Sequence, residues 1–182
     1  ATRPERRLLA ALRRGGYEAL VQKEGQSAWT PDFGTFRLAR SFGLTVVGAR
    51  PFLIAYNFTL SSTLQRKESK LIAGSIRESS SGLKGVRAIG WWMEGYRRAQ
   101  VSCNLTDTFS VSAKELFDAV SAEAHRLGGT VEASELIGLI PAHGLRGFAP
   151  LEDAVSYLKL DGHGAFNLKS RLLENLLNTL PS

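Results

Sequence analysis

The sequence has little that could form a covalent or metal-bound site. Its single cysteine, Cys103, cannot form a disulfide within the chain, and no CxxC or Cys/His zinc pattern exists. Neither phosphate-binding glycine motif, GxGxxG or GxxxxGK[ST], occurs. The histidines His125, His143 and His163 lie far apart, without a nucleophile, a carboxylate or a metal ligand at motif spacing. We therefore expect no metal and no self-contained catalytic constellation.

Long apolar segments are also absent. No uninterrupted run approaches the length of about 18 residues that a membrane span needs, and we expect none. What is present is an ordinary mixture of 43% hydrophobic and 22% charged residues over 182 positions. Such a chain can bury a core without disulfides and is long enough for one domain or two small ones.

The formal net charge of +6 is unevenly distributed. Residues 1–43 contain eight Arg or Lys against four Asp or Glu, which is +4, so the remaining residues carry +2. A basic segment can attract polyanionic ligands, acidic proteins or, as the weaker alternative, nucleic acid. A merely solvated basic face explains the charge equally well.

Hydrophobic spacing and breaker residues predict the secondary structure. The predicted helices are 4–14, 64–78, 112–127, 150–159 and 167–178. The predicted strands are 86–93, 99–106 and 130–141, and 44–60 is predicted as one long strand or as two strands with a kink near Arg50-Pro51. Residues 17–43 are predicted to be irregular. Ser112 and Glu115 fit a capping box.

The order from residue 44 to 141 is β, α, β, β, α, β. This order is typical of an α+β, ferredoxin-like fold: one antiparallel sheet with two helices on one face. An N-terminal helix and loop and C-terminal helices are added to it. In 99–106, Cys103 alternates toward the buried face, and Gln100, Ser102 and Asn104 alternate toward the other. Trp91 and Trp92 place one indole on each face. The polar face is available for solvent, a partner or a ligand.

Several collinear segments resemble the formiminotransferase domain of glutamate formiminotransferases and of formimidoyltransferase-cyclodeaminase. They are YEAL, W-x-PDFG, TVVGARPFLIAYN, IRES, V-x-AIGWW, AQVSCNLTD and SELIGLIP. The resemblance implies two α/β subdomains that flank a charged tunnel. Tetrahydrofolate and N-formimino-L-glutamate bind there, and a formimino group passes to N5 of the folate, a reaction of histidine metabolism. By this resemblance, residues 1–43 are the tail of the first subdomain and 44–182 are the second.

The resemblance also implies site residues. The family's folate loop corresponds to Gly34, Thr35, Phe36, Arg37, Leu38, Ala39, Arg40, Ser41, Phe42 and Gly43. Of these, Arg37 and Arg40 look like additions to the family pattern, and two guanidinium groups suit the carboxylates of a folate. Further cleft-facing candidates are Arg50, Asn57, Gln100, Ser102 and Asn104. For Arg50 the alternative is a structural carboxylate pair, and for Asn57 it is a backbone hydrogen bond.

None of the three histidines matches the family's catalytic histidine, which lies in the first subdomain upstream of these residues. The chain alone is therefore predicted to be inactive, and two loops are shorter than the family pattern.

One hypothesis is an enzyme that needs the other half. A second is an inactive paralogue that serves as a structural subunit, with its free sheet face covered by the N-terminal subdomain or another protein. A third is a folate-binding module without catalysis. The enzyme would be cytoplasmic, and a processed subunit would be mitochondrial or plastid.

Overall fold

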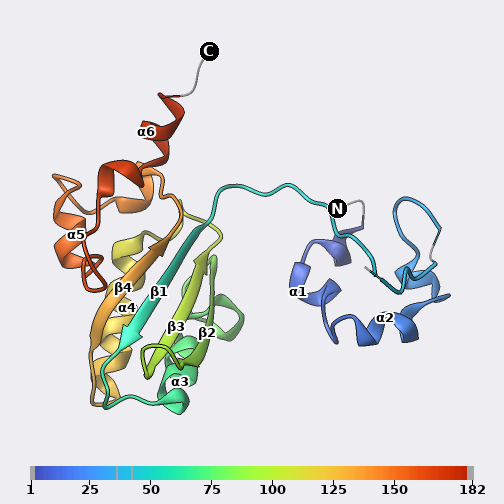
Figure 1. Ribbon diagram of the computed structural model, residues 1–182, viewed down its shortest axis with the longest axis horizontal. Helices are drawn as coiled ribbons and strands as arrows, with labels where there is room; N and C mark the ends of the chain where they lie inside the picture. Colours follow the sequence, from blue (N-terminus) through green and yellow to red (C-terminus); the bar gives the residue numbers. More distant parts are fainter. Residues whose placement is uncertain (1–2, 36, 42, 180–182) are drawn as a thin grey trace. The chain divides into compact units, whose positions relative to one another are not determined.

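The computed structural model describes residues 3–35, 37–41 and 43–179, and these form two compact units divided between Arg50 and Pro51. The larger unit is an α+β domain (Figure 1), and the smaller one consists of short helical turns and loops. Among the described residues, no helix is both long and apolar enough to cross a membrane.

The smaller unit contains η1 (Pro4–Arg6), α1 (Leu9–Leu12), α2 (Glu18–Lys23) and η2 (Ser27–Trp29). The prediction of one helix over 4–14 was wrong, because Leu8 has extended backbone angles and separates η1 from α1. The prediction that 17–43 is irregular missed α2. The side chain of Arg6 holds the unit together: it contacts Asp32 at 3.0 Å and donates to the carbonyl oxygens of Ala28 and Thr30.

The larger unit is built on a four-stranded antiparallel sheet of β1 (Ile54–Leu60), β2 (Val86–Met93), β3 (Arg98–Leu105) and β4 (Val131–Ile137). Its strand order is β2-β3-β1-β4. Strand β3 lies between β1 and β2, and β1 lies between β3 and β4. The two strands of each βαβ unit are therefore separated by one strand of the other unit. The predicted α+β class is confirmed, and the interleaved order is that of split βαβ units.

Helices α3 (Arg66–Ile76) and α4 (Ala113–Arg126) cover one face of this sheet (Figure 1). The core forms between them and the inward residues of the strands, including Tyr56, Phe58 and Val101. Both helices begin with a capping box, and the one at Ser112 and Glu115 confirms the prediction. The remaining elements are η3 (Glu78–Ser80), η4 (Ala142–Leu145), α5 (Asp153–Tyr157), η5 (Leu168–Ser170) and α6 (Leu173–Leu177).

The first predicted strand was too long. Residues 44–53 have no strand structure, and the strand begins only at Ile54. Two features of this stretch explain the difference: Pro51 has no N–H to donate to a neighbouring strand, and Val46 and Val47 are exposed rather than packed. Arg50 is consequently not on the sheet. The predicted C-terminal helices are also shorter, as α5 and as η5 with α6.

Candidate functional site

The sheet face opposite α3 and α4 carries polar residues from all four strands. The pairing register places side chains in transverse rows. One row is Arg87, Asn104, Ala55 and Ile137; the next is Ile89, Ser102, Asn57 and Glu135; the third is Trp91, Gln100, Thr59 and Ala133. We call this surface the open face. It combines amide, hydroxyl and carboxylate groups with a rim of exposed apolar side chains, of which Ile89 and Ile137 are the largest aliphatic ones.

The third row is a hydrogen-bonded relay across the sheet. Trp91 donates its indole N–H to the Gln100 carbonyl oxygen at 3.0 Å. The Gln100 amide nitrogen lies 3.5 Å from the Thr59 hydroxyl, a contact that is longer than an ordinary hydrogen bond. Thr59 in turn lies 2.9 Å from Nε2 of His163. We refer to these four residues as the Trp91–His163 relay. Because indole nitrogen can only donate, Gln100 must accept from it and donate onward to Thr59.

Two turns meet over this row. His163 follows α5, and its ring stacks on Tyr96 from the β2–β3 turn, with centroids 4.8 Å apart. Under these rings and beside Trp91, Gln100 and Thr59 are almost fully buried, with 1% and 4% of their surfaces exposed. The relay therefore closes one end of the open face, while Asn57, Ser102 and Asn104 stay accessible.

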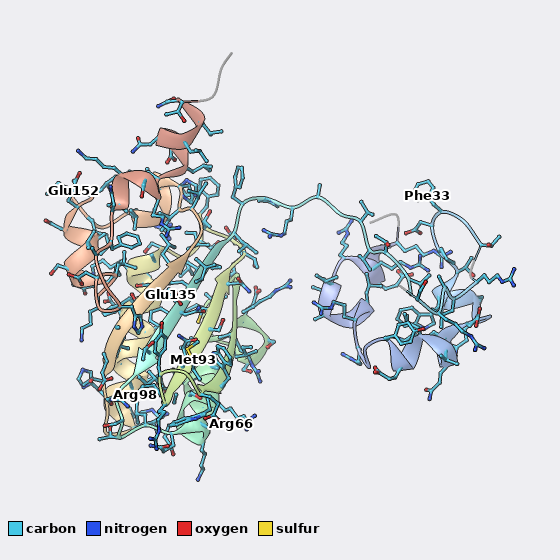
Figure 2. All side chains as sticks on the ribbon, viewed as in Figure 1. Phe33, Arg66, Met93, Arg98, Glu135 and Glu152 are labelled. Atoms are coloured by element: carbon cyan, nitrogen blue, oxygen red, sulfur yellow. The ribbon has the colours of Figure 1, made fainter. Side chains whose placement is uncertain are left out.

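Glu135 lies in the second row, on the exposed face of the sheet (Figure 2). Its carboxylate accepts from the side-chain amide of Asn57 at 3.4 Å, which is longer than an ordinary hydrogen bond. The other acidic group on β4, Glu132, is paired with Arg98 at 3.1 Å. The second row thus holds a carboxylate and an amide side by side without a cation between them.

Sequence reasoning placed several residues correctly. Gln100, Ser102 and Asn104 lie on the open face with Asn57, and Cys103 lies in the core. Burial raises the pKa of the Cys103 thiol far above its ordinary value, which makes it a poor nucleophile. Trp91 is exposed on the open face and Trp92 packs against the core, so the two indoles do lie on opposite faces.

Other residues of this surface were missed. Thr59 and Glu135 follow from the period of two along their strands, so alternation could have found them. His163 and Tyr96 lie in turns, and their contacts join residues distant in sequence, which local patterns do not reveal. His143 has a similar arrangement elsewhere: its Nε2 lies 2.8 Å from the Thr108 hydroxyl.

The predicted folate loop belongs to the smaller unit, where Phe36 and Phe42 lie outside the described residues. Its middle is held in place by the two residues that flank α2: Leu38 donates its N–H to Glu24 at 2.9 Å, and Tyr17 donates to the Arg40 carbonyl oxygen at 2.7 Å. Gly43 takes a positive φ of 71° and donates to the Ala39 carbonyl oxygen. The remaining members of the described loop are Gly34, Thr35 and Ser41, all exposed.

The two loop arginines, Arg37 and Arg40, are exposed, and neither guanidinium makes an ion pair within the described part of the chain. They are therefore available to an anionic ligand. Arg50, also exposed, lies in the irregular stretch before the sheet. In the described ranges, no group of three or more His, Cys, Asp or Glu side chains is arranged to hold a metal ion.

The fold is thus an α+β domain of two split βαβ units with one polar sheet face. Residues 55–176 match the family model described as formiminotransferase domain, and residues 1–50 match formiminotransferase domain, N-terminal subdomain. The chain belongs to the formiminotransferase family, as its motifs predicted.

Curated relatives agree. The formimidoyltransferase-cyclodeaminase of Mus musculus is 38% identical over 97% of this chain and 36% of its own length. The glutamate formimidoyltransferase of Streptococcus pyogenes serotype M1 is 37% identical over 97% of this chain and 56% of its own length. That of Thermoplasma acidophilum is 34% identical over 98% and 57%. The chain spans just over one third of the first relative and over half of the other two.

Proposed function

We propose that this chain provides substrate-binding surfaces for the transfer of a formimino group from N-formimino-L-glutamate to tetrahydrofolate. The single observation that carries the proposal is the open face, on which Asn57, Ser102, Asn104 and Glu135 remain accessible while the opposite face is filled by helices. Membership in a family whose relatives are called glutamate formimidoyltransferases supplies the reaction class.

The reaction needs binding and proton transfer. N5 of the folate attacks the formimino carbon, the bond from that carbon to the glutamate nitrogen breaks, and a proton moves from N5 to the departing amine. Amide and hydroxyl groups of the open face can orient a polar ligand. Within the smaller unit, taken by itself, the exposed Arg37 and Arg40 can pair with carboxylates. We assign no general base among His125, His143 and His163, because none of them matches the catalytic histidine that the family resemblance implies. The proposed chain is a binding half that is inactive alone.

Calorimetric titration with 5-formyltetrahydrofolate tests this function. The chain is expected to bind with a dissociation constant of about 1 µM to 1 mM, the usual range for enzyme substrates. Asn104→Leu is expected to weaken binding at least tenfold, because a branched apolar group replaces an exposed amide on the open face. Lys67→Ala changes an exposed residue of α3, on the other side of the sheet, and is the matched control.

Transfer of the formimino group is expected only after the upstream half of a family enzyme is added. Absence of folate binding, alone and with that half, contradicts the proposal.

A second function is favoured by the apolar rim. Ile89 is 64% exposed, Ile137 47% and Trp91 39%, and all three lie on the open face. Exposed apolar patches are typical of protein–protein interaction sites. In this alternative the chain is an inactive paralogue whose open face is covered by another subunit. Cross-linking and size-exclusion chromatography of native extract distinguish the two, because the alternative requires a stable complex and no folate binding.

A further inference from the structure

Among the half-buried carboxylates of the described chain, Glu135 stands apart. The others in this class are Glu68, Asp107, Asp118 and Glu123, and each accepts a hydrogen bond of 2.9 Å or shorter. Glu135 has only the 3.4 Å contact with the amide of Asn57. A half-buried carboxylate with one long protein contact keeps acceptor capacity, so a bound group that supplies N–H donors could use it.

The surroundings of Glu135 restrict the chemistry of that group. Asn57 points its amide N–H toward Glu135, which leaves the Asn57 carbonyl oxygen as an acceptor in the same row as the Ser102 hydroxyl. In the neighbouring row, Ala55 and Ile137 form an apolar surface beside the two polar side chains. The arginines of this face do not lie on β4 with Glu135. Arg87 is on β2, and Arg98 is on β3, where it is paired with Glu132. The row therefore suits a flat group that carries two N–H donors on one edge.

We propose that Glu135, with Asn57, binds a planar N–C–N donor pair of the substrate. A carboxylate receives two parallel N–H bonds from such a group, as it does from a guanidinium. This inference rests on the proposed function, because both substrates of that reaction carry the group. The formimino group is a formamidine, and the pterin ring of a folate presents N3–H and a 2-amino group. Both are tested below as sources of the same chemistry.

The test uses NMR of the full isotope-labelled chain, with the Asn57 side-chain amide as reporter. Pterin is compared with lumazine, in which an oxygen acceptor replaces the 2-amino donor, and formamidinium is compared with formamide. Pterin or formamidinium is expected to shift the Asn57 amide, and lumazine or formamide to bind at least tenfold more weakly. A response to pterin identifies the pterin edge as the source, and a response to formamidinium identifies the formimino group.

The variant Glu135→Gln is expected to weaken binding of the responding probe at least tenfold, because a carboxamide cannot accept both N–H bonds. Glu132→Gln, on the same strand but paired with Arg98, is the matched control and is expected to bind as the wild type does. Circular dichroism verifies that both variants fold. The inference is overturned if Glu135→Gln binds within twofold of the wild type, or if neither probe shifts Asn57. If 5-formyltetrahydrofolate still binds in that case, the proposed function stands and only this site assignment fails.

Discussion

The hydroxyl of Thr59 lies 2.9 Å from Nε2 of His163, a residue 104 positions further along the chain. This contact joins the C-terminal end of β1 to the turn that follows α5. Through Gln100 and Trp91 it continues across three strands, so that one hydrogen-bonded row closes an end of the open face. One end of the open face is therefore bounded by side chains that contact one another, those of the Trp91–His163 relay.

Replacing Thr59 by valine tests whether this boundary contributes to stability. The substitution keeps the β-branched shape but leaves the buried Gln100 amide and the His163 ring without their shared partner. We expect the free energy of unfolding to fall by about 1–3 kcal/mol, the usual cost of an unpaired buried polar group. Urea denaturation measures this change in the free energy of unfolding. The control is Thr130→Val, since the exposed Thr130 side chain makes no hydrogen bond to described residues; its expected effect lies within about 0.5 kcal/mol. Equal stability of the two variants contradicts the prediction.

The geometry of the relay favours one tautomer of His163. Gln100 accepts from Trp91 and turns its amide toward Thr59, and the Thr59 hydroxyl can then donate its own proton to Nε2 of His163. We therefore predict that neutral His163 carries its proton on Nδ1. Nitrogen chemical shifts of the imidazole ring, measured on the neutral ring, identify the protonated nitrogen directly. In Thr59→Val the preference is expected to disappear, while exposed His125 at the end of α4 serves as an internal reference. A proton on Nε2 of His163 would refute the relay direction.

Local sequence patterns predicted much of the fold and only part of the site. Strand β2 has the predicted bounds, and the capping box at Ser112 is confirmed. Both features depend only on residues that are close in sequence, through period-two alternation and through capping. The stretch 44–53 was assigned to a strand on its apolar composition alone. Composition does not reveal that no neighbouring strand is there to accept its hydrogen bonds.

The site followed the same division. Asn57, Ser102 and Asn104 were found because they alternate with core residues, whereas His163 reaches the open face through a long-range contact. Gln100 was assigned correctly to the polar face, yet it is buried, because turns distant in sequence cover it. Which polar side chains stay accessible is decided by those turns, and sequence alternation cannot distinguish them.

Acid sensitivity should depend on Glu115 at the start of α4. Hydrogen bonds from the Ser112 backbone and hydroxyl, together with the charge of Arg146, lower the pKa of the Glu115 carboxyl. A lowered pKa stabilises the fold above the unfolded value of about 4.3, and this contribution is lost as the pH falls through the lower folded value. We expect Glu115→Gln, which can keep the capping box, to lose less thermal stability between pH 7 and pH 3 than the wild type.

The matched control for that experiment is Glu152→Gln, which changes an exposed carboxylate (Figure 2) whose side chain makes no cap hydrogen bond at the start of α5. Its stability is expected to follow pH as the wild type does. Thermal melts monitored by circular dichroism at the two pH values give the comparison. If Glu115→Gln and Glu152→Gln show the same pH sensitivity, the carboxylate of Glu115 is not a source of the acid dependence.

Two glycines offer an opposed pair of substitutions that tests how closely α3 packs on the sheet. A Cβ at Gly90, on β2, would collide with the backbone of Ser69 and Lys70, neither of which can rotate away. A Cβ at Gly74, inside α3, meets nothing within 4 Å. We expect Gly90→Ala to lower the free energy of unfolding by about 1–3 kcal/mol or more through overpacking. Gly74→Ala should raise it by about 0.5–1 kcal/mol, because alanine is the better helix former. Urea denaturation of both variants decides the matter: a tolerated alanine at position 90 would mean that α3 and β2 are not in backbone contact.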